Sequence, residues 1–350
     1  MKRKQLYLHI GRAKVGSTAL QHFLWTNRQL LAQQGVLYPD SVMMQSASHK
    51  LALVFQHELP DAEPVRELSA AEVYGAMFDE AERLNLRRIV ASSENLFLVK
   101  PAEPARCMRR GYDVRIVCYV RRQDEVLVSS YIQELKTGDS NAQRGIEKFA
   151  SDPLRLAWLD YEPVLDAWAA QFGRENIIVR VAEKEQLRGT IFEDFLDLVG
   201  VDTSGMTFPQ TRLNPSPARD ILDFIQMINA APAPGPRMKF QLRDPLLALS
   251  ERIGAQGRYS PRSLVPAGLR RELMERFRKS NAAVARKYLG REDGILFRDD
   301  RIEESDADTP YAGLDLERFA HMMATLLGTQ QHRILNLQRQ INELKHRLEQ

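Results

Sequence analysis

The chain has little cysteine. Its 350 residues include two cysteines, Cys107 and Cys118, which are too few for a disulfide framework and lack the paired CxxC spacing of a zinc site. We expect both thiols to be reduced and buried. The sequence therefore argues against a disulfide-stapled secreted domain and against a structural zinc centre.

Long apolar runs are missing as well. No stretch approaches the roughly 18 uncharged apolar residues that a membrane span requires. The run Leu6 to Leu8 follows a basic N-terminus, but His9 interrupts it, and it is too short for a signal peptide. We therefore expect a cytoplasmic protein without a membrane span.

No charge of one sign dominates the sequence. Lys and Arg number 49 against 46 Asp and Glu, which leaves a net charge of +3 and gives no general case for binding nucleic acid or membrane. Any anion site must therefore be local. Hydrophobic residues make up 44% of the chain, enough to bury the core of one large α/β domain or of two small ones.

Short apolar runs bounded by turns predict four buried strands. They are Gln5 to Ile10, Arg88 to Ser93, Val114 to Val120 and Ile177 to Val181. Helical spacing of apolar residues separates the strands, and two further clear helices are expected at 186–199 and 267–288. Strands that alternate with helices imply crossover connections, so we expect an α/β fold of three layers, with a central parallel sheet flanked by helices.

The C-terminal region differs from the rest. Residues 299–312 are acidic, polar and without periodicity, which predicts a linker after a domain formed by 1–298. In 313–350, six apolar residues recur at the two apolar positions of a heptad: Leu327, Ile334, Leu337, Ile341, Leu344 and Leu348. The pattern predicts either a short coiled coil, which would allow a homo-oligomer, or a terminal helix packed on its own domain. The sequence favours neither.

A glycine-bounded loop lies between the first predicted strand and the helix after it. Gly11 and Gly16 have the spacing of the nucleotide-hydrolase pattern GxxxxGK[ST], but Ser17 takes the position of its lysine, and Lys14 lies ahead of the second glycine. Backbone N–H groups in such a loop converge on an anion, so we expect it to bind phosphate. The residues expected to surround the anion are Arg12, Ala13, Lys14, Val15, Gly16, Ser17 and Thr18.

The position of Lys14 favours one chemistry over another. A lysine directly after the second glycine reaches the β- and γ-phosphates of a nucleoside triphosphate, and the hydroxyl after it binds magnesium. A lysine within the loop can instead lie beside the bridging oxygen of a phosphosulfate, where charge develops as the sulfuryl group leaves. That chemistry requires no metal. A glycine turn that merely joins strand to helix is the alternative interpretation.

A second cluster follows the third predicted strand. Arg121 leaves that strand at its carboxyl end, where open α/β sheets bind ligands, and Ser129 follows about two helical turns later. An arginine fork and a hydroxyl together suit one phosphate group. Taken alone, Arg121 and Arg122 are more typical of a solvated, salt-bridged strand end.

Together the two clusters resemble the sulfotransferases that use 3′-phosphoadenosine 5′-phosphosulfate (PAPS). Lys14 to Thr18 resembles their 5′-phosphosulfate loop, and Arg121 with Ser129 resembles their 3′-phosphate site. The runs His9 to Gly11 and Thr18 to Gln21 are similar to the bacterial and carbohydrate branch.

The resemblance covers about Lys4 to Phe297. It implies a P-loop-like fold, PAPS as the donor, no metal, a bacterial source and a glycan or polysaccharide hydroxyl as the acceptor. Three features depart from the usual pattern of the family: Ser17, Arg12, and Arg122-Gln123 after the arginine.

Transfer to a hydroxyl also needs a base that removes its proton. In carbohydrate-type sulfotransferases the base lies between the first helix and the second strand, which points to His49. The alternative is Glu94, at the carboxyl end of the second predicted strand, and Ser93 would assist in binding donor or acceptor. Arg212 and Asn214 resemble a polar turn of bacterial members, although capping of the next helix explains them slightly better.

Two other classes of function stay open on the sequence alone. One is a nucleotide-dependent kinase or hydrolase, which would bind ATP with magnesium at the glycine loop. The other is a non-catalytic scaffold that oligomerises through 327–348. A lipid or small phenolic hydroxyl also stays open as the acceptor.

Overall fold

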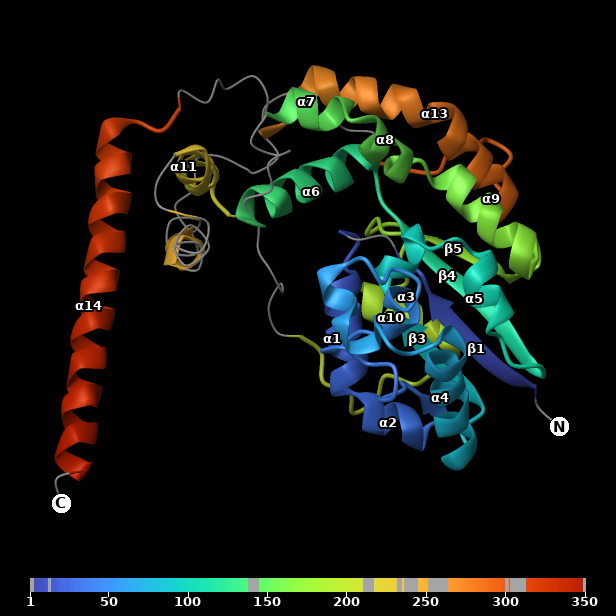
Figure 1. Ribbon diagram of the computed structural model, residues 1–350. Coiled ribbons are helices and arrows are strands. Elements are labelled where there is room, and N and C mark those ends of the chain that lie inside the picture. The colour runs from blue at the N-terminus through green and yellow to red at the C-terminus, as the bar shows by residue number, and fades with distance from the viewer. Residues whose placement is uncertain are drawn as a thin grey trace. The chain divides into compact units, whose positions relative to one another are not determined.

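Five parallel strands form one sheet in the computed structural model, which describes residues 3–11, 14–137, 145–209, 217–231, 235, 245–250, 264–299, 302 and 313–348. The spatial order is β2-β3-β1-β4-β5, and β1, β3, β4 and β5 are labelled in Figure 1. The strands are β1 (Lys4–His9), β2 (Val36–Leu37), β3 (Arg88–Ser92), β4 (Tyr112–Val120) and β5 (Ile177–Val181). The predicted parallel sheet and the four predicted strands are confirmed. The fifth strand, β2, escapes the sequence patterns because two residues carry no periodicity.

Helices cover both faces of the sheet. The core on one face includes Leu6 and Leu8 of β1 and side chains of α3 (Lys50–Leu53), α4 (Ala70–Arg83), α9 (Tyr161–Phe172) and α13 (Ala267–Leu289). The core on the other face includes Tyr7 and side chains of α1 (Ser17–Thr26), α2 (Arg28–Gln33) and α10 (Ile191–Val199). Successive strand side chains point to opposite faces, so burial of both sets produces the predicted three layers.

Further helices connect these elements or follow them. They are η1 (Pro60–Val65), η2 (Glu94–Leu98), α5 (Ala102–Arg106), α6 (Gln123–Thr137), α7 (Ile146–Ser151), α8 (Pro153–Leu159), η4 (Arg174–Asn176), α11 (Arg219–Ala230) and α14 (Leu316–Leu348). The helix predicted at 267–288 is confirmed by α13.

The helix predicted at 186–199 begins later, at Ile191. Thr190 and Glu193 form a capping box, in which the Thr190 N–H donates to the Glu193 carboxylate at 2.7 Å and the Glu193 N–H donates to Thr190 Oγ1 at 3.4 Å. Gly189 has a φ of 77°, in the left-handed region that glycine adopts without strain. The prediction is therefore wrong for 186–190, because the apolar pattern runs on through the capped turn.

The strand order creates a switch point between β1 and β4. The connection that leaves β1 runs to β2 on one side of the sheet, whereas the connection that leaves β4 runs to β5 on the other. The two strands pair in parallel, from Lys4 opposite Tyr112 to His9 opposite Val117. Open α/β sheets bind ligands beyond the carboxyl ends of two such strands. The topology therefore points to the residues that follow β1 and β4.

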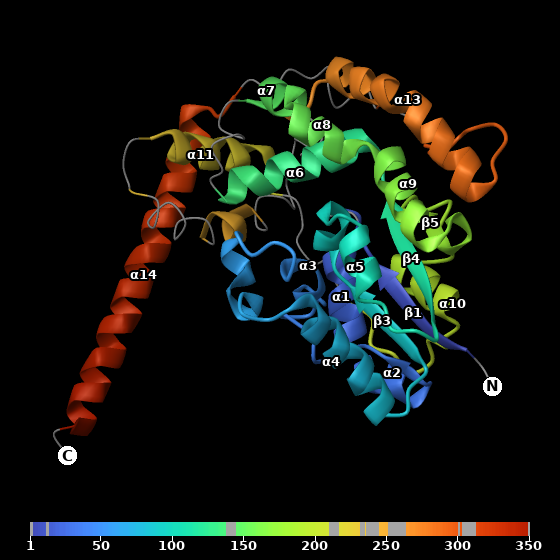
Figure 2. The ribbon, with the colours of Figure 1, turned by 45° about the vertical axis from the view of Figure 1, so that its right-hand side comes forward.

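The chain forms two compact units with interleaved sequence ranges. The first unit holds the sheet and comprises Met1–Val126, Pro153–Leu213 and Glu272–Arg301. The second comprises Leu127–Asp152, Asn214–Arg271 and Ile302–Gln350. In the second unit α11 packs on the start of α14 (Figures 1 and 2). The boundaries predicted at 298 and 312 stay a prediction, because most of 299–312 lies outside the described residues.

Both cysteines are free thiols, as predicted. Cys118 is buried in β4, whereas Cys107 is half-buried, so the expected burial is confirmed for Cys118 and wrong for Cys107. Burial, and then the nearby Glu103 carboxylate, raises the pKa of the Cys107 thiol, so this thiol is a poor nucleophile at neutral pH. In the residues that the structure describes, no helix is both long and apolar enough to span a bilayer.

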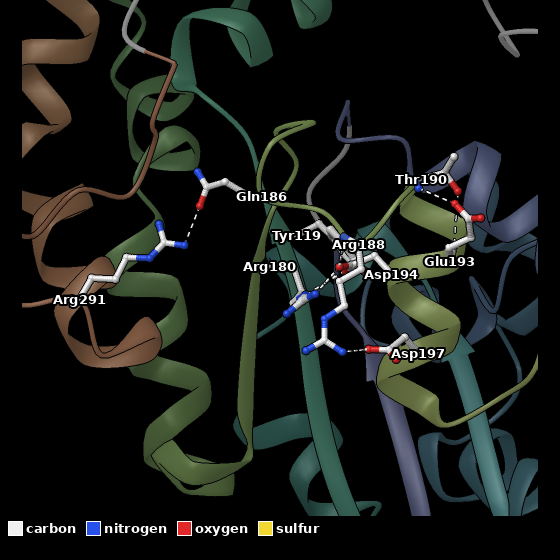
Figure 3. A network of polar contacts seen from close by, with 9 residues as sticks. All are labelled: Tyr119, Arg180, Gln186, Arg188, Thr190, Glu193, Asp194, Asp197 and Arg291. Carbon is white, nitrogen blue, oxygen red and sulfur yellow. Dashed lines mark hydrogen bonds and ion pairs between the residues drawn. The ribbon is translucent and has the colours of Figure 1, made fainter.

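A buried carboxylate ties β4, β5 and α10 together (Figure 3). Asp194 of α10 is fully buried and accepts hydrogen bonds from the Tyr119 hydroxyl at 2.6 Å and from Arg180 Nε at 2.9 Å. The backbone N–H of Arg188 donates to the same carboxylate at 3.0 Å. Burial alone would raise the pKa of Asp194, but the hydrogen bonds from Arg180 and Tyr119 outweigh it and hold the pKa below its usual value.

Removal of this charge should destabilise the edge of the sheet. We expect Asp194→Asn to lower the free energy of unfolding by about 3 kcal/mol at neutral pH, because it leaves Arg180 without its counter-charge. Since folding lowers the pKa of Asp194, the stabilisation is complete at neutral pH and is lost as the pH falls through the folded-state pKa. Thermal and urea unfolding at pH 7 and at acid pH measure both effects.

Asp197→Asn is the matched control for that substitution. Asp197 lies on the same helix, but its partner Arg188 and its own carboxylate are exposed (Figure 3), so its loss should cost less than about 1 kcal/mol. If the two variants lost equal stability, Asp194 would not have the role described here.

Candidate active site

The loop after β1 contains two residues in the left-handed backbone region. Lys14 has a φ of 73° and Gly16 a φ of 96°. A positive φ is uncommon for a residue with a side chain and marks a backbone held by its surroundings. Gly16 immediately precedes α1, so the loop leads into a helix N-terminus, the end of a helix that favours an anion.

The other predicted loop residues differ in exposure. Val15 and Ser17 are buried, and Thr18 is exposed. Arg12 and Ala13 lie outside the described residues, as do Arg212 and Asn214 of the predicted polar turn, so their roles stay predictions. The loop therefore presents Lys14 and the start of α1 beyond the carboxyl end of β1.

A close approach explains glycine at the start of the loop. A Cβ on Gly11 would lie 2.2 Å from Nε2 of His9, the last residue of β1. The His9 ring is fully buried, with Nδ1 2.7 Å from Ser92 Oγ and with no hydrogen-bond partner for Nε2 in the described part of the chain. Burial, opposed in part by the Glu94 charge, lowers the pKa of His9 to about 4. A neutral imidazole therefore lies under the loop at physiological pH.

Arg121 joins the second predicted cluster to the loop. Its Nη1 donates to the carbonyl oxygen of Lys14 at 3.2 Å, and its Nε donates to the Glu125 carboxylate one helical turn later. The Tyr161 hydroxyl accepts from the Arg121 N–H at 3.3 Å and donates to the Arg121 carbonyl. Backbone and side chain of Arg121 are thus both fixed, and the guanidinium lies against the lysine loop.

The neighbouring arginine has a different role. Arg122 is buried and donates to both oxygens of Asp124, at 3.1 Å each, and to the Asp299 carbonyl. The interpretation of this pair as a solvated strand end is therefore wrong for Arg122, which is a buried structural residue. Ser129 is half-buried on α6, in the part of that helix that belongs to the second unit. Its pairing with Arg121 stays a prediction.

Backbone pairing brings His49 to the end of β3. The Ser48 N–H donates to the Ser92 carbonyl at 2.8 Å, and the Ser92 N–H donates to Ser48 Oγ at 3.2 Å. His49 is the next residue, and its Nδ1 lies 2.9 Å from Ser93 Oγ. This contact holds the imidazole ring through Nδ1.

Glu94 follows Ser93 directly, so the two candidate bases lie at the same strand end. The Gln21 amide of α1 donates to the Glu94 carboxylate at 2.6 Å, which ties the first helix after the lysine loop to the end of β3. Burial, and then the Glu94 charge, raises the pKa of Tyr38, whose hydroxyl donates to the Ser46 carbonyl at 2.8 Å. Glu94 therefore acts electrostatically on both His9 and Tyr38, which lie in different segments.

Sequence reasoning missed part of this cluster. Gln21 belongs to the run Thr18 to Gln21, which gives it no separate role, and no local sequence pattern singles out Tyr38. His9 precedes the glycine loop directly in the sequence, and only this position indicates that the His9 side chain lies beneath the loop. The remaining contacts join residues far apart in the chain, which local patterns cannot reveal.

The arrangement combines a glycine loop at the start of a helix, a fixed arginine and two side chains, His49 and Glu94, of types that can accept a proton. These lie beyond the carboxyl ends of β1, β4 and β3, which are neighbours in the sheet. Within the described ranges, no set of three or more His, Cys, Asp and Glu side chains is placed to hold a metal ion. A loop at a helix N-terminus and an arginine are groups that suit an anion, and histidine and glutamate are groups that suit proton transfer.

Comparisons with known proteins find partial likeness. No protein-family model matches the chain. Over 190 residues it is 29% identical to an uncharacterised protein of Archaeoglobus fulgidus, and the match covers 54% of this chain and 50% of that protein. The match thus spans about half the length of this curated relative.

Two solved structures resemble the chain loosely. A sulfotransferase from Alicyclobacillus acidocaldarius has a TM-score of 0.40 and 17% identity, over 69% of this chain and 95% of that one. The sulfotransferase domain of the curacin biosynthetic pathway has a TM-score of 0.34 and 11% identity, over 79% of this chain and 97% of that one. The fold class rests on the strand order and the layers described above.

Proposed function

We propose that this chain is a sulfotransferase that transfers the sulfuryl group of PAPS to an acceptor hydroxyl. The observation that carries the proposal is the hydrogen bond from Arg121 Nη1 to the Lys14 carbonyl, at 3.2 Å. It joins the lysine loop to the arginine that follows β4, at the switch point where open α/β sheets bind ligands. A donor with a 5′-phosphosulfate and a 3′-phosphate needs two such anion-binding elements close together.

The loop fits a phosphosulfate group. Gly11 and Gly16 allow the backbone to run close to His9 and Ile191, where a Cβ would crowd their side chains, and α1 adds N–H donors. In the proposed complex Arg12 to Thr18 surround the phosphosulfate, and Lys14 stabilises the charge that develops on the bridging oxygen. PAPS supplies the activated sulfuryl group, and the chemistry requires no metal.

Arg121 is the proposed ligand of the 3′-phosphate. Its side chain is 34% exposed, so it can meet a ligand while Glu125 and the Lys14 carbonyl orient it. The spacing in the sequence adds Ser129 to this role. Because the same guanidinium contacts the loop, binding of the 3′-phosphate would also help to set the backbone conformation of Lys14.

A base at the end of β3 completes the proposal. The acceptor oxygen forms its bond to sulfur as the bond from sulfur to the bridging oxygen breaks, and the acceptor proton passes to His49 or Glu94. The products are the sulfated acceptor and adenosine 3′,5′-bisphosphate. We propose a glycan or polysaccharide hydroxyl as the acceptor. This choice depends on two runs, 9–11 and 18–21, that resemble the carbohydrate branch of the sulfotransferases.

Nucleotide binding separates this function from a kinase or hydrolase. We expect isothermal titration calorimetry to show binding of adenosine 3′,5′-bisphosphate without metal, and far weaker binding of ATP with magnesium. Arg121→Ala should weaken binding of the bisphosphate by about 10- to 100-fold, because it removes charged hydrogen bonds. Arg106→Ala, at an exposed arginine of α5, is the control and should bind as the wild type does. Tight binding of ATP with magnesium alone would favour the kinase or hydrolase.

Lys14 should act on the transition state more than on binding. We expect Lys14→Ala to lower turnover by about 100-fold or more, with a much smaller loss of affinity for adenosine 3′,5′-bisphosphate. Turnover is measured with labelled PAPS and the best acceptor from a screen of a polysaccharide, a lipid alcohol and a phenol. Lys100→Ala, at an exposed lysine, is the control. Equal losses of turnover and affinity would contradict the proposed role.

Paired substitutions should identify the base. Replacement of the true base, by His49→Gln or Glu94→Gln, should lower turnover by about 100- to 10,000-fold without weakening nucleotide binding. If His49 is the base, Ser93→Ala should also lower turnover, because it frees the imidazole ring. If Glu94 is the base, Gln21→Ala should do so instead. Turnover within about tenfold of wild type in both Gln variants would exclude both residues.

A further inference from the structure

The C-terminal part of α14 has an apolar face that no described element of its own unit covers. Phe319, Met322, Met323 and Leu326 pack in the core that includes α11, but every side chain from 331 to 347 is exposed. In Figures 1 and 2 no other described element of this unit runs alongside the end of α14 that leads to the C-terminus. Packing within the unit accounts for the first turns of α14 and leaves the rest unexplained.

Apolar residues in this part of the sequence form a seam with heptad spacing. The seam consists of Leu327, Ile334, Leu337, Ile341, Leu344 and Leu348. From Leu327 to Leu344 its side chains are between 48% and 63% exposed. A helix that keeps an apolar stripe in water gains no tertiary packing, on which most helical stability in proteins depends. A second helix packed on the seam would remove the stripe from water.

We propose that two copies of this chain pair through the seam as a parallel, two-stranded coiled coil. Ile334 and Ile341 take the a position of the heptad, and Leu337 and Leu344 take the d position. Isoleucine at a with leucine at d favours two parallel strands. In that arrangement each seam residue packs against the same residue of the second copy, so the partner that fits the seam is the chain itself.

Charge and polarity favour the same orientation. In a parallel pair Arg333 lies near Gln338 of the second copy, and Gln330 faces the second copy's Gln330. An antiparallel pair with the apolar layers in register would place Arg333 opposite the second copy's Arg347, and Gln330 opposite its Leu348. Like charges and a buried, unpaired amide both weaken an interface.

An anionic membrane surface is the competing partner for this helix. Residues 327–348 contain four Lys and Arg against one Glu, and basic amphipathic helices can lie on lipid. Interfacial helices, however, carry Trp or Phe on their apolar face, and 327–348 contains no aromatic residue. The narrow a/d stripe suits a second helix better than a lipid surface.

Sedimentation equilibrium of the full chain tests the proposal. At micromolar concentration the wild type should have twice the 40.1 kDa mass of one chain. Ile334→Lys should raise the dissociation constant by about 100-fold or more, because it places a charge in the seam. Leu335→Lys is the matched control. Leu335 follows Ile334 directly and is also apolar and exposed, but it lies off the seam, so the dissociation constant should stay within about twofold of the wild-type value. Near-UV circular dichroism of the tryptophans, all of which precede α14, reports whether each variant is folded.

Cysteine cross-linking tests the orientation. Leu344→Cys should give a disulfide-linked dimer on mild oxidation, because the d position faces itself in a parallel pair. Arg339→Cys, on the outer face of the helix, and the wild type with Cys107 and Cys118 are the controls and should give none.

Four results would overturn the proposal: a monomeric wild type, equal effects of Ile334→Lys and Leu335→Lys, no cross-link in Leu344→Cys, or a monomer that binds phosphatidylserine vesicles through Ile334. None of these measurements uses a nucleotide. The dimer and the sulfotransferase function can therefore fail independently of each other.

Discussion

The parallel pairing of β1 with β4 is the constraint on which the candidate site depends. In this register His9 lies opposite Val117, so β1 ends at the level of the last residues of β4. The loop that follows β1 and the arginine that follows β4 then meet within hydrogen-bond distance. Connections that leave the two strands in opposite directions keep the space beyond them open for a ligand. The site is therefore a consequence of strand order more than of any single residue.

Three arginines around these strand ends show how the protein distributes charge. Arg122 and Arg180 each face a buried aspartate, which offsets the cost of removing their charge from water. Arg121 is more exposed and shares its donors between a carboxylate and a backbone carbonyl. A phosphate can compete more easily for a guanidinium of this kind than for one paired with a fully buried carboxylate. The carboxylate partner thus distinguishes the three arginines: Asp124 and Asp194 are fully buried, whereas Glu125 beside Arg121 is partly exposed.

Local patterns predict the layers of this protein better than its contacts. The four longer strands follow from apolar runs, and the lysine loop follows from its glycines and from the end of the first strand. The start of α10 does not, because Thr190 caps a helix inside an unbroken apolar pattern. The bonds from His49 to Ser93 and from Gln21 to Glu94 join residues 44 and 73 positions apart. The first exists because Ser48 pairs with Ser92 at the end of β3, and the second because parallel pairing aligns the end of β3 with the end of β1. Periodicity contains no information about either alignment.

The sequence pattern of α14 also leaves its contacts undetermined. Its heptad pattern fits a coiled coil and a packed terminal helix equally, because both bury one stripe. The structure divides the helix into a packed part and an exposed part: Met322 and Leu326 are buried in the second unit, whereas Leu327, where the proposed seam begins, is exposed. A stripe that turned steadily with the 3.6-residue period would drift away from a straight partner, while the strict sevenfold spacing from Leu327 to Leu348 holds one face toward a supercoiled helix. The change from buried to exposed apolar residues at Leu327 therefore fits the proposed dimer, in which the first turns of α14 pack in their own unit and the later turns pair with a second copy.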